Sequence, residues 1–269
     1  DLTEEPLKIA VCAQHSNGGL DANIWWESNI KHLFPVGEVN GSHGVSRPGG
    51  SALNAGQVGG LRAAQYISNR YDEFEVDYSR FLREARPRVD RVMDKAKRWL
   101  EDNSSSTDKL SPKEARRDLQ ERMSKAYGPI RKVEEVKTEA KEAEKFFRSI
   151  DQILVADKKS DLPAAFQTRH LALTHLFYAL AIKNYVENGG GSRGSYMIVD
   201  GEGDSVIKAL PEDLRYRSED ESLRARIQEL LKEPEGEIST RWVDRRDLPE
   251  EKFWFETVWK EFREGEVFD

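Results

Sequence analysis

The sequence has very little cysteine and no long apolar run. Its single cysteine, Cys12, cannot form an internal disulfide, which fits a reducing compartment, so we expect a cytoplasmic protein. No stretch of about 18 apolar residues occurs, and this argues against a membrane-spanning helix. The chain starts at Asp1 without an initiator Met or an apolar signal segment. We therefore expect it to be a piece of a longer protein.

The chain also lacks an excess of positive charge. It has 42 Lys and Arg against 49 Asp and Glu, a net charge of -7, and an isoelectric point near 5.5. This balance argues against a nucleic-acid-binding protein, which would need a clustered basic face. Charged residues make up 34% of the chain and the mean hydropathy is -0.73. Such a composition predicts helical arms rather than one compact globule.

Histidine is also scarce. Only five histidines are present, and His170 and His175 are five positions apart in an apolar helical pattern. That spacing does not place both side chains on one helix face, so we expect them in the core or at its edge. Metal-dependent hydrolysis is therefore poorly supported, and we predict no metal site.

The first part of the chain, residues 1–72, predicts a small layer of strands and one helix. The apolar runs "LKIAVCA" (7–13) and "LFPVGEV" (33–39) favour two buried strands, separated by the turn signal Asn17-Gly18-Gly19. A helix follows from Ser51 to about Arg70. The fold class of this part is α/β or α+β.

Residues 73–188 predict a three-helix bundle. The first helix carries a stripe at three- and four-residue steps that one face would bury, formed by Val89, Val92, Met93, Ala96, Trp99 and Leu100. The second begins at the cap Ser111-Pro112 and runs to about Leu154, with a kink or short break at Gly128-Pro129. The third, "AAFQTRHLALTHLFYALAIKNYV" (164–186), is nearly all apolar and is expected to be the most enclosed.

Residues 189–269 predict a mixed C-terminal region. "GSYMIVDGEGD" (194–204) favours a strand and turn, and "SLRARIQELLKE" (222–233) a short helix. "GGGSRG" (189–194) matches a dinucleotide-binding pattern but follows a helix and opens none, so we expect a turn that exposes Arg193. Three tryptophans are expected to dock onto the body of the protein: Trp242, Trp254 and Trp259.

A glycine-rich stretch before the Ser51 helix is the strongest candidate site. Gly37-Glu38 ends the second predicted strand, and Arg47-Pro48-Gly49-Gly50 leads into the helix N-terminus, where unpaired N–H groups favour an anionic or electron-rich ligand. Small residues along the helix would let a backbone or a flat cofactor come close: Ala52, Ala55, Gly56, Gly59 and Gly60. From the residues alone, a tightly packed helix on a sheet remains an equal alternative.

These residues carry a resemblance to a known family. "LFPVGEVNGSHGVSRPGGSALNAGQVGGLRAAQYI" (33–67) resembles the second flavin-binding segment of the succinate dehydrogenase and fumarate reductase flavoproteins, which include L-aspartate oxidase. "RRDLQERMSKAYGPIRK" and "NGGGSRGSY" resemble parts of that family's helical bundle and the turn after it. The resemblance implies an α+β, mainly helical fold: a remnant of an FAD-binding α/β layer, a three-helix bundle and a small mixed C-terminal region.

The resemblance implies roles for particular residues. Glu38, after Gly37, matches the carboxylate that binds FAD hydroxyls, and a carboxylate accepts such hydrogen bonds well. Arg47 matches the arginine that holds a substrate carboxylate and takes part in proton transfer. The helix start, "SAL" (51–53), falls where the family contacts the flavin, so Ser51, Ala52 and Leu53 would lie against the ring.

The sequence departs from the family pattern at the substrate. Aligning "QHSNGG" with the family's His-Tyr-x-x-Gly-Gly places Gln14 at the substrate-binding histidine and His15 at the tyrosine. Gln brings no titratable proton. Pro48 and Ala52 also replace the usual Leu and Ser. Succinate or fumarate as the substrate is therefore in doubt.

The resemblance implies the C-terminal fragment of an FAD-dependent oxidoreductase, inactive alone because the N-terminal Rossmann unit and capping domain are missing. Its partners would be those missing segments and an electron-transfer subunit, with no nucleic acid; with one cysteine here, any iron–sulfur cluster must lie elsewhere. The alternative is a non-catalytic helical module, in which residues 76–190 and the tryptophan-rich tail dock another subunit.

Overall fold

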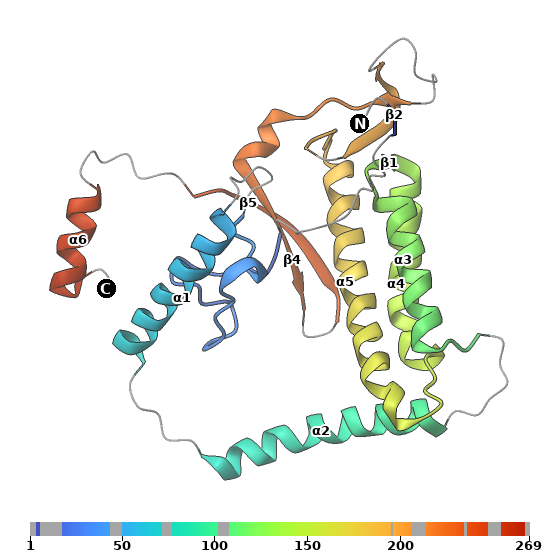
Figure 1. The fold of residues 1–269 in the computed structure, drawn as a ribbon, viewed down its shortest axis with the longest axis horizontal. Helices are drawn as coiled ribbons and strands as arrows, with labels where there is room; N and C mark the ends of the chain where they lie inside the picture. Colours follow the sequence, from blue (N-terminus) through green and yellow to red (C-terminus); the bar gives the residue numbers. More distant parts are fainter. Residues whose placement is uncertain are drawn as a thin grey trace. The chain divides into compact units, whose positions relative to one another are not determined.

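The computed structural model describes residues 4–5, 18–43, 50–71, 77–101, 108–194, 196–205, 214–233, 236–246 and 254–266. The chain divides into two compact units (Figure 1). One unit comprises Asp1–Glu75 together with Leu248–Asp269, and the other comprises Val76–Asp247. No described helix has the length and apolar character needed to cross a membrane.

The first unit contains a short 3-10 turn, η1 (Gly37–Val39), and the helices α1 (Ser51–Arg70) and α6 (Trp254–Glu264). Helix α1 has the predicted bounds. The predicted strand 33–39 is wrong: this segment ends in η1, where Gly37 has a φ of +79°. Among the described residues, the nearest β-type pairing is a single bridge between Leu20 and Asn40, just after the segment. The predicted strand 7–13 lies outside the described residues.

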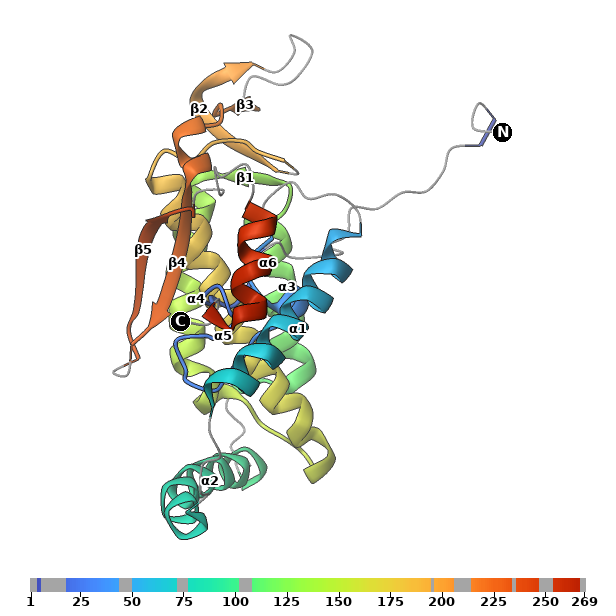
Figure 2. The ribbon, with the colours of Figure 1, turned by 90° about the vertical axis from the view of Figure 1, so that its left-hand side faces the viewer.

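The second unit is built around a bundle of three helices, α3 (Pro112–Tyr127), α4 (Val133–Ile153) and α5 (Leu162–Glu187). They run side by side in both views (Figure 2), and α5 packs against both of the others. A three-helix bundle is present as predicted, but its members differ: the helix with Trp99, expected to be the first, is not one of the three, and the expected second helix supplies both α3 and α4. The cap of α3 is confirmed, because the Ser111 hydroxyl and the Glu114 side chain each bond the other's backbone N–H. The kink or short break expected at Gly128-Pro129 is a break: α3 ends at Tyr127, and α4 begins at Val133 after the short strand β1 (Ile130–Lys132).

Small residues fill the contacts between these helices. Seven alanines of the bundle are buried and let the backbones come close: Ala115, Ala126, Ala140, Ala143, Ala165, Ala172 and Ala179. Larger apolar side chains form two clusters in the core of this unit. Ile150 and Leu154 lie in one cluster with Trp99, whereas Val136 and Ile198 lie in a second cluster nearer β1.

Helix α2 (Tyr78–Glu101) crosses the end of the bundle and extends beyond it (Figure 1). Only its last turns are packed, because Ala96 and Trp99 are buried against the bundle core. The prediction that the whole apolar stripe is buried is wrong for Val89, Val92 and Met93, which are 56%, 49% and 52% exposed. The stripe therefore continues beyond the part of the bundle that could cover it.

The C-terminal part of this unit holds two small sheets. Strand β2 (Met197–Ser205) pairs in parallel with β1 and antiparallel with β3 (Arg215–Tyr216). The second sheet is a hairpin of β4 (Arg226–Lys232) and β5 (Ile238–Asp244) that lies beside α5 (Figure 1).

The helix predicted at 222–233 is therefore wrong. The segment forms a short 3-10 turn, η3 (Glu221–Ala225), followed by β4. Gln228 of β4 lies opposite Trp242 of β5, and both side chains donate hydrogen bonds to the amide oxygen of Asn184 in α5 (2.7 and 2.9 Å). This tertiary anchor favours the strand over the local helical pattern.

The turn predicted after the third helix of the bundle is present. Gly189, with a φ of +84°, follows α5, and the next regular element is β2, as expected for a turn rather than a dinucleotide site. The prediction that Arg193 is exposed is wrong, because Arg193 forms an ion pair with Glu219 (3.0 Å).

The tryptophans differ in their outcomes. Trp242 docks on α5 as predicted, whereas Trp259 in α6 is 51% exposed and contradicts the prediction. The side chain of Trp254 lies outside the described residues.

Candidate functional site

The candidate site is built where η1 packs directly on α1. A Cβ atom added to Gly56 of α1 would lie only 3.6 Å from the Cα of Gly37. One turn further along, a Cβ on Gly59 would lie 2.7 Å from Nε1 of Trp26. The small residues of α1 thus let a neighbouring backbone and an indole ring come close, and the backbone of η1 is brought beside the first two turns of the helix.

A pair of backbone hydrogen bonds holds the turn that carries Glu38. The N–H of Leu20 donates to the carbonyl of Val39 (2.8 Å), and the N–H of Gly41 donates back to the carbonyl of Leu20 (2.9 Å). The buried side chain of Asn40 accepts a hydrogen bond from the N–H of Ser42 (2.9 Å). Glu38 is solvent-exposed on this anchored turn.

The N-terminus of α1 suits a negative or electron-rich group. Gly50 precedes the helix with a φ of +80° and provides no side-chain cap. Its carbonyl accepts hydrogen bonds from the N–H groups of Leu53 (3.1 Å) and Asn54 (3.3 Å). The first turn contains no acidic residue that would neutralise the positive end of the helix dipole. Ser51 and Ala52 are half-buried there, and the Leu53 side chain is exposed.

The structure brings some of the predicted site residues together. Gly37, Glu38, Ser51, Ala52 and Leu53 all lie on η1 or on the first turn of α1. The residues expected to hold substrate lie outside the described part of the chain: Gln14, His15 and Arg47. The described geometry therefore concerns the flavin side of the predicted site.

Sequence reasoning missed the aromatic residues that fix this unit. The Tyr71 hydroxyl donates to the Glu27 carboxylate, which also accepts from the backbone N–H of His32 (2.9 Å). The hydrogen bond from Tyr71 is the main cause that lowers the pKa of Glu27, and burial with the bond to Glu27 raises the pKa of Tyr71 to about 12. This contact ties the loop before η1 to the end of α1.

A second aromatic contact lies one turn earlier on α1. The guanidinium of Arg62 lies 4.4 Å from the ring centre of Trp25, and Trp25 stacks on Tyr66 at 5.5 Å. Arg62 and Tyr66 are four residues apart and so share a helix face. That spacing, together with the Trp25-Trp26 pair, is the sequence signal that could have identified this packing.

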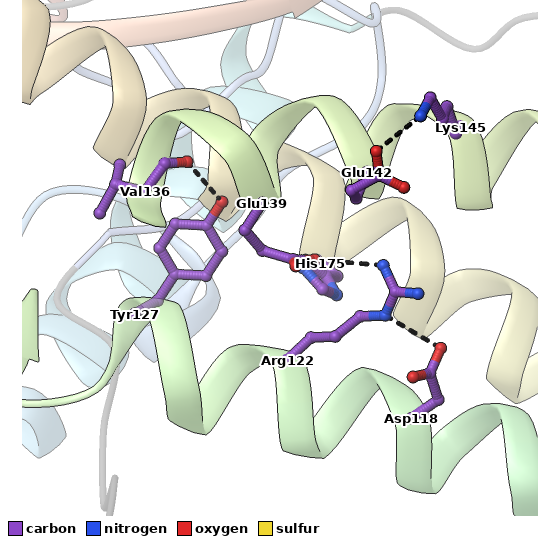
Figure 3. A network of polar contacts seen from close by, with 8 residues as sticks. All are labelled: Asp118, Arg122, Tyr127, Val136, Glu139, Glu142, Lys145 and His175. Carbon is purple, nitrogen blue, oxygen red and sulfur yellow. Dashed lines mark hydrogen bonds and ion pairs between the residues drawn. The ribbon is translucent and has the colours of Figure 1, made fainter. Parts of the chain in front are cut away.

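A polar network lies inside the bundle of the second unit (Figure 3). Arg122 of α3 pairs with Asp118 (3.0 Å) and with Glu139 of α4 (3.4 Å). His175 of α5 is 3% exposed, and its Nε2 lies 3.5 Å from the Glu139 carboxylate, too far for a hydrogen bond. The Tyr127 hydroxyl donates to the carbonyl of Val136 (3.3 Å) at one end.

The network is a structural feature of the core. Burial raises the pKa of Glu139 and, with the Arg122 charge, lowers the pKa of His175 to about 4. Among the described residues, neither ring nitrogen of His175 has a hydrogen-bond partner. His175 lies in the core as predicted, whereas His170 is exposed. Within the described ranges no group of three metal-binding side chains occurs.

We expect His175 to make the bundle sensitive to acid. Its folded pKa of about 4 lies below the ordinary value, so the unfolded chain binds the proton first as the pH falls. The free energy of unfolding should therefore fall by about 2–3 kcal/mol between about pH 6.5 and pH 4 because of this residue. His175→Leu should remove that part of the pH dependence, measured by urea unfolding at several pH values.

The matched control is His170→Leu, on the exposed side of the same helix. It should leave the pH dependence as in the unmodified chain. If the His175→Leu profile instead runs parallel to that of the unmodified chain between about pH 6.5 and pH 4, His175 does not stay neutral in the folded bundle.

Comparisons with known proteins confirm the resemblance to flavoproteins of the succinate dehydrogenase and fumarate reductase type. No protein-family model matches the chain. Sequence relatives include a fumarate reductase (CoM/CoB) subunit from Methanothermobacter marburgensis, 45% identical over 64 residues, which are 23% of this chain and 12% of that protein. They also include the chloroplastic L-aspartate oxidase of Oryza sativa subsp. japonica, 30% identical over 139 residues, which are 51% of this chain and 20% of that protein.

Solved structures show the same fold. A variant FrdA chain of E. coli quinol fumarate reductase matches with a TM-score of 0.62 at 18% identity, covering 88% of this chain and 38% of that one. Adenylylsulfate reductase from the hyperthermophilic Archaeoglobus fulgidus matches with a TM-score of 0.55 at 14% identity, covering 85% of this chain and 34% of that one. The chain thus spans well under half the length of these relatives.

Proposed function

We propose that residues 1–72 are the C-terminal part of an FAD-binding domain and supply half of a flavin site. The observation that carries this proposal is the contact of Gly37 with Gly56, which brings Glu38 beside the first turns of α1. An exposed carboxylate next to an uncapped helix N-terminus fits a cofactor that has both hydroxyl groups and an electron-rich ring. Residues 73–188 would be the helical domain, and 189–269 the mixed C-terminal region.

The residues of η1 and of the first turn of α1 have separate roles in this proposal. The Glu38 carboxylate accepts hydrogen bonds from FAD hydroxyls, and the backbone of Gly37 allows the turn that presents it. The first turn of α1 lies at the flavin ring with Ser51, Ala52 and Leu53, and directs the N–H groups of Ser51 and Ala52 and the positive end of its dipole toward it. Bound flavin supplies hydride transfer, and these residues hold and orient it.

The substrate side of the site is assigned by resemblance. Arg47 would hold a substrate carboxylate through its two-pronged guanidinium and would handle a proton there. Gln14 would hydrogen-bond the same small molecule, with His15 next to it. Gln14 has no titratable proton, which argues against succinate or fumarate as the carboxylate-bearing substrate.

Activity would require the rest of a flavoprotein. The aligned regions are 12% and 20% of the two sequence relatives, so a Rossmann unit for the ADP part of FAD and a capping segment would come from elsewhere. The proposed parent is an FAD-dependent oxidoreductase of the cytoplasm that exchanges electrons with another subunit. The chain alone would be catalytically inactive, since half of the flavin site is not enough for stable binding.

Flavin binding tests this proposal. The chain is titrated with FAD alone and then together with the segment encoded directly upstream, and the visible absorption spectrum is recorded. Bound flavin is expected only in the second mixture. There, Glu38→Gln should weaken FAD binding by about 10–100-fold, since hydrogen bonds to a charged acceptor contribute about 1.5–3 kcal/mol.

The matched control is Asp21→Asn, which removes one exposed carboxylate from the same unit and should leave FAD affinity unchanged. If the chain alone binds flavin, seen as a yellow colour, and transfers electrons from a donor to an acceptor, the proposal that it supplies only half of the flavin site is wrong. Equal FAD affinity for Glu38→Gln and the unmodified chain would contradict the assigned role of Glu38.

A further inference from the structure

The exposed part of α2 carries a regular seam of apolar residues. The seam positions alternate at steps of four and three along the helix and are Tyr78, Leu82, Ala85, Val89 and Val92. This spacing is the heptad repeat that lets one helix pack lengthwise against another. Phe81 and Met93, both exposed, lie beside the seam and widen it.

The same seam already packs against helices at its other end. Its next two positions are Ala96 and Trp99, which are buried in the bundle core. Trp99 contacts Phe166 of α5 with ring centres 4.9 Å apart. The seam therefore has the spacing and the mix of small and large residues for helix packing. In its first four turns the large side chains are exposed: Tyr78, Leu82, Val89 and Val92.

The charge around the seam is positive. Helix α2 carries eight Lys and Arg against four Asp and Glu, within a chain whose net charge is -7. Arg86 and Arg88 are exposed and flank the exposed seam, one on each side. In paired helices these flanking positions meet the flanking positions of the partner, so an acidic partner is favoured.

We propose that the exposed seam of α2 docks a helix of another protein whose apolar face is bordered by Asp or Glu. A second copy of this chain is disfavoured, because it would bring arginines against arginines at the flanking positions. A membrane surface is disfavoured by the small Ala85 at the centre of the exposed seam, since interfacial helices bury a continuous face of large apolar side chains. The proposal does not depend on the proposed flavin site.

The test uses two synthetic three-heptad peptides with Leu at the seam positions. One carries Glu at the flanking positions and the other carries Lys, and fluorescence anisotropy of the labelled peptide reports binding to the full chain. The acidic peptide should bind at least about tenfold more tightly than the basic one at low salt, and this preference should shrink at high salt. Val89→Asp, in the centre of the seam, should weaken binding of the acidic peptide at least about tenfold.

A charge-reversal variant distinguishes charge-selective docking at the seam from nonspecific peptide binding. The double variant Arg86→Glu and Arg88→Glu should reverse the preference, so that the basic peptide binds more tightly. The matched control is Arg83→Glu with Arg91→Glu, which makes the same charge change on the opposite face of α2. That control should keep the preference for the acidic peptide, and circular dichroism should show both variants as helical as the unmodified chain.

Several results would overturn the proposal. Equal binding of the two peptides, or the same reversal in the Arg83 and Arg91 control, would mean that the seam does not select its partner by charge. Sedimentation that shows a dimer broken by Val89→Asp would assign the seam to a second copy. Flotation with phosphatidylserine vesicles that depends on Val89 would assign it to a membrane. Amide exchange in the exposed half of α2 as slow as in α5 would show that the chain itself covers the seam.

Discussion

Trp99→Ala is expected to lower the free energy of unfolding of the bundle by about 3–5 kcal/mol, the usual cost of removing a large aromatic side chain from a core. Trp99 is 1% exposed and packs its ring against Phe166. Its Nε1 donates a hydrogen bond to the backbone carbonyl of Asp151 (3.2 Å). It is also the one large buried side chain that α2 contributes to the described core. Urea unfolding followed by far-ultraviolet circular dichroism measures the loss.

Trp259→Ala is the control for this prediction. Trp259 is 51% exposed in α6, where its ring stacks on Phe262 at 5.8 Å. Its removal should change the free energy of unfolding by less than about 1 kcal/mol. If the two alanine variants unfold at the same urea concentration, the buried position of Trp99 does not contribute to stability as the structure implies.

The bundle could be predicted because its signals are local. The 3.6-residue period of apolar positions and the cap at Ser111 and Glu114 each depend on residues within a few turns of one another. Such signals locate a helix and its start without any knowledge of what packs against it. They could not show that α2 packs against the bundle only in its last turns, at Ala96 and Trp99, because exposure depends on neighbours in space.

The errors in the fold come from contacts between distant residues. The segment at 222–233 has a helical apolar pattern, yet Gln228 and Trp242 both reach Asn184, and Trp242 is 58 residues from it in the chain. Likewise, β1 exists because Ile130 pairs with Met197 of β2. Sequence pattern alone carries no information on these pairings.

The candidate site could be predicted in part. The run from Gly37 to Leu53 identified the carboxylate, the glycines and the helix start, since each has a distinct physical role in a cradle. The backbone clasp, which consists of the bridge between Leu20 and Asn40 and its two main-chain hydrogen bonds, was not predicted. Main-chain hydrogen bonds depend little on which side chains are present, so the sequence does not reveal them. The expected strand at 33–39 is wrong for the same reason: its apolar run was clear, but among the described residues the only bridge nearby is at Asn40, just after it.

Gly19→Ala is expected to open this clasp. A Cβ atom on Gly19 would overlap the carbonyl oxygen of Val39 and lie 2.8 Å from the carbonyl carbon of Asn40, and backbone atoms cannot turn aside as a flexible side chain can. The two segments would have to separate, which weakens the hydrogen bonds between Leu20 and its partners Val39 and Gly41. The expected cost to the first unit is about 2–3 kcal/mol, from overpacking and from about 1 kcal/mol for each weakened hydrogen bond.

The adjacent glycine provides the control, because a Cβ on Gly18 would have no atom within 4 Å. Gly18→Ala should therefore leave the unit as stable as before, whereas Gly19→Ala should speed amide exchange at Leu20 and Gly41 by about 30–150-fold if the opening free energy falls as expected. Since the clasp holds the turn that presents Glu38, only Gly19→Ala should also weaken FAD binding in the completed site. Equal exchange rates in the two variants would mean that the clasp does not hold the turn in solution.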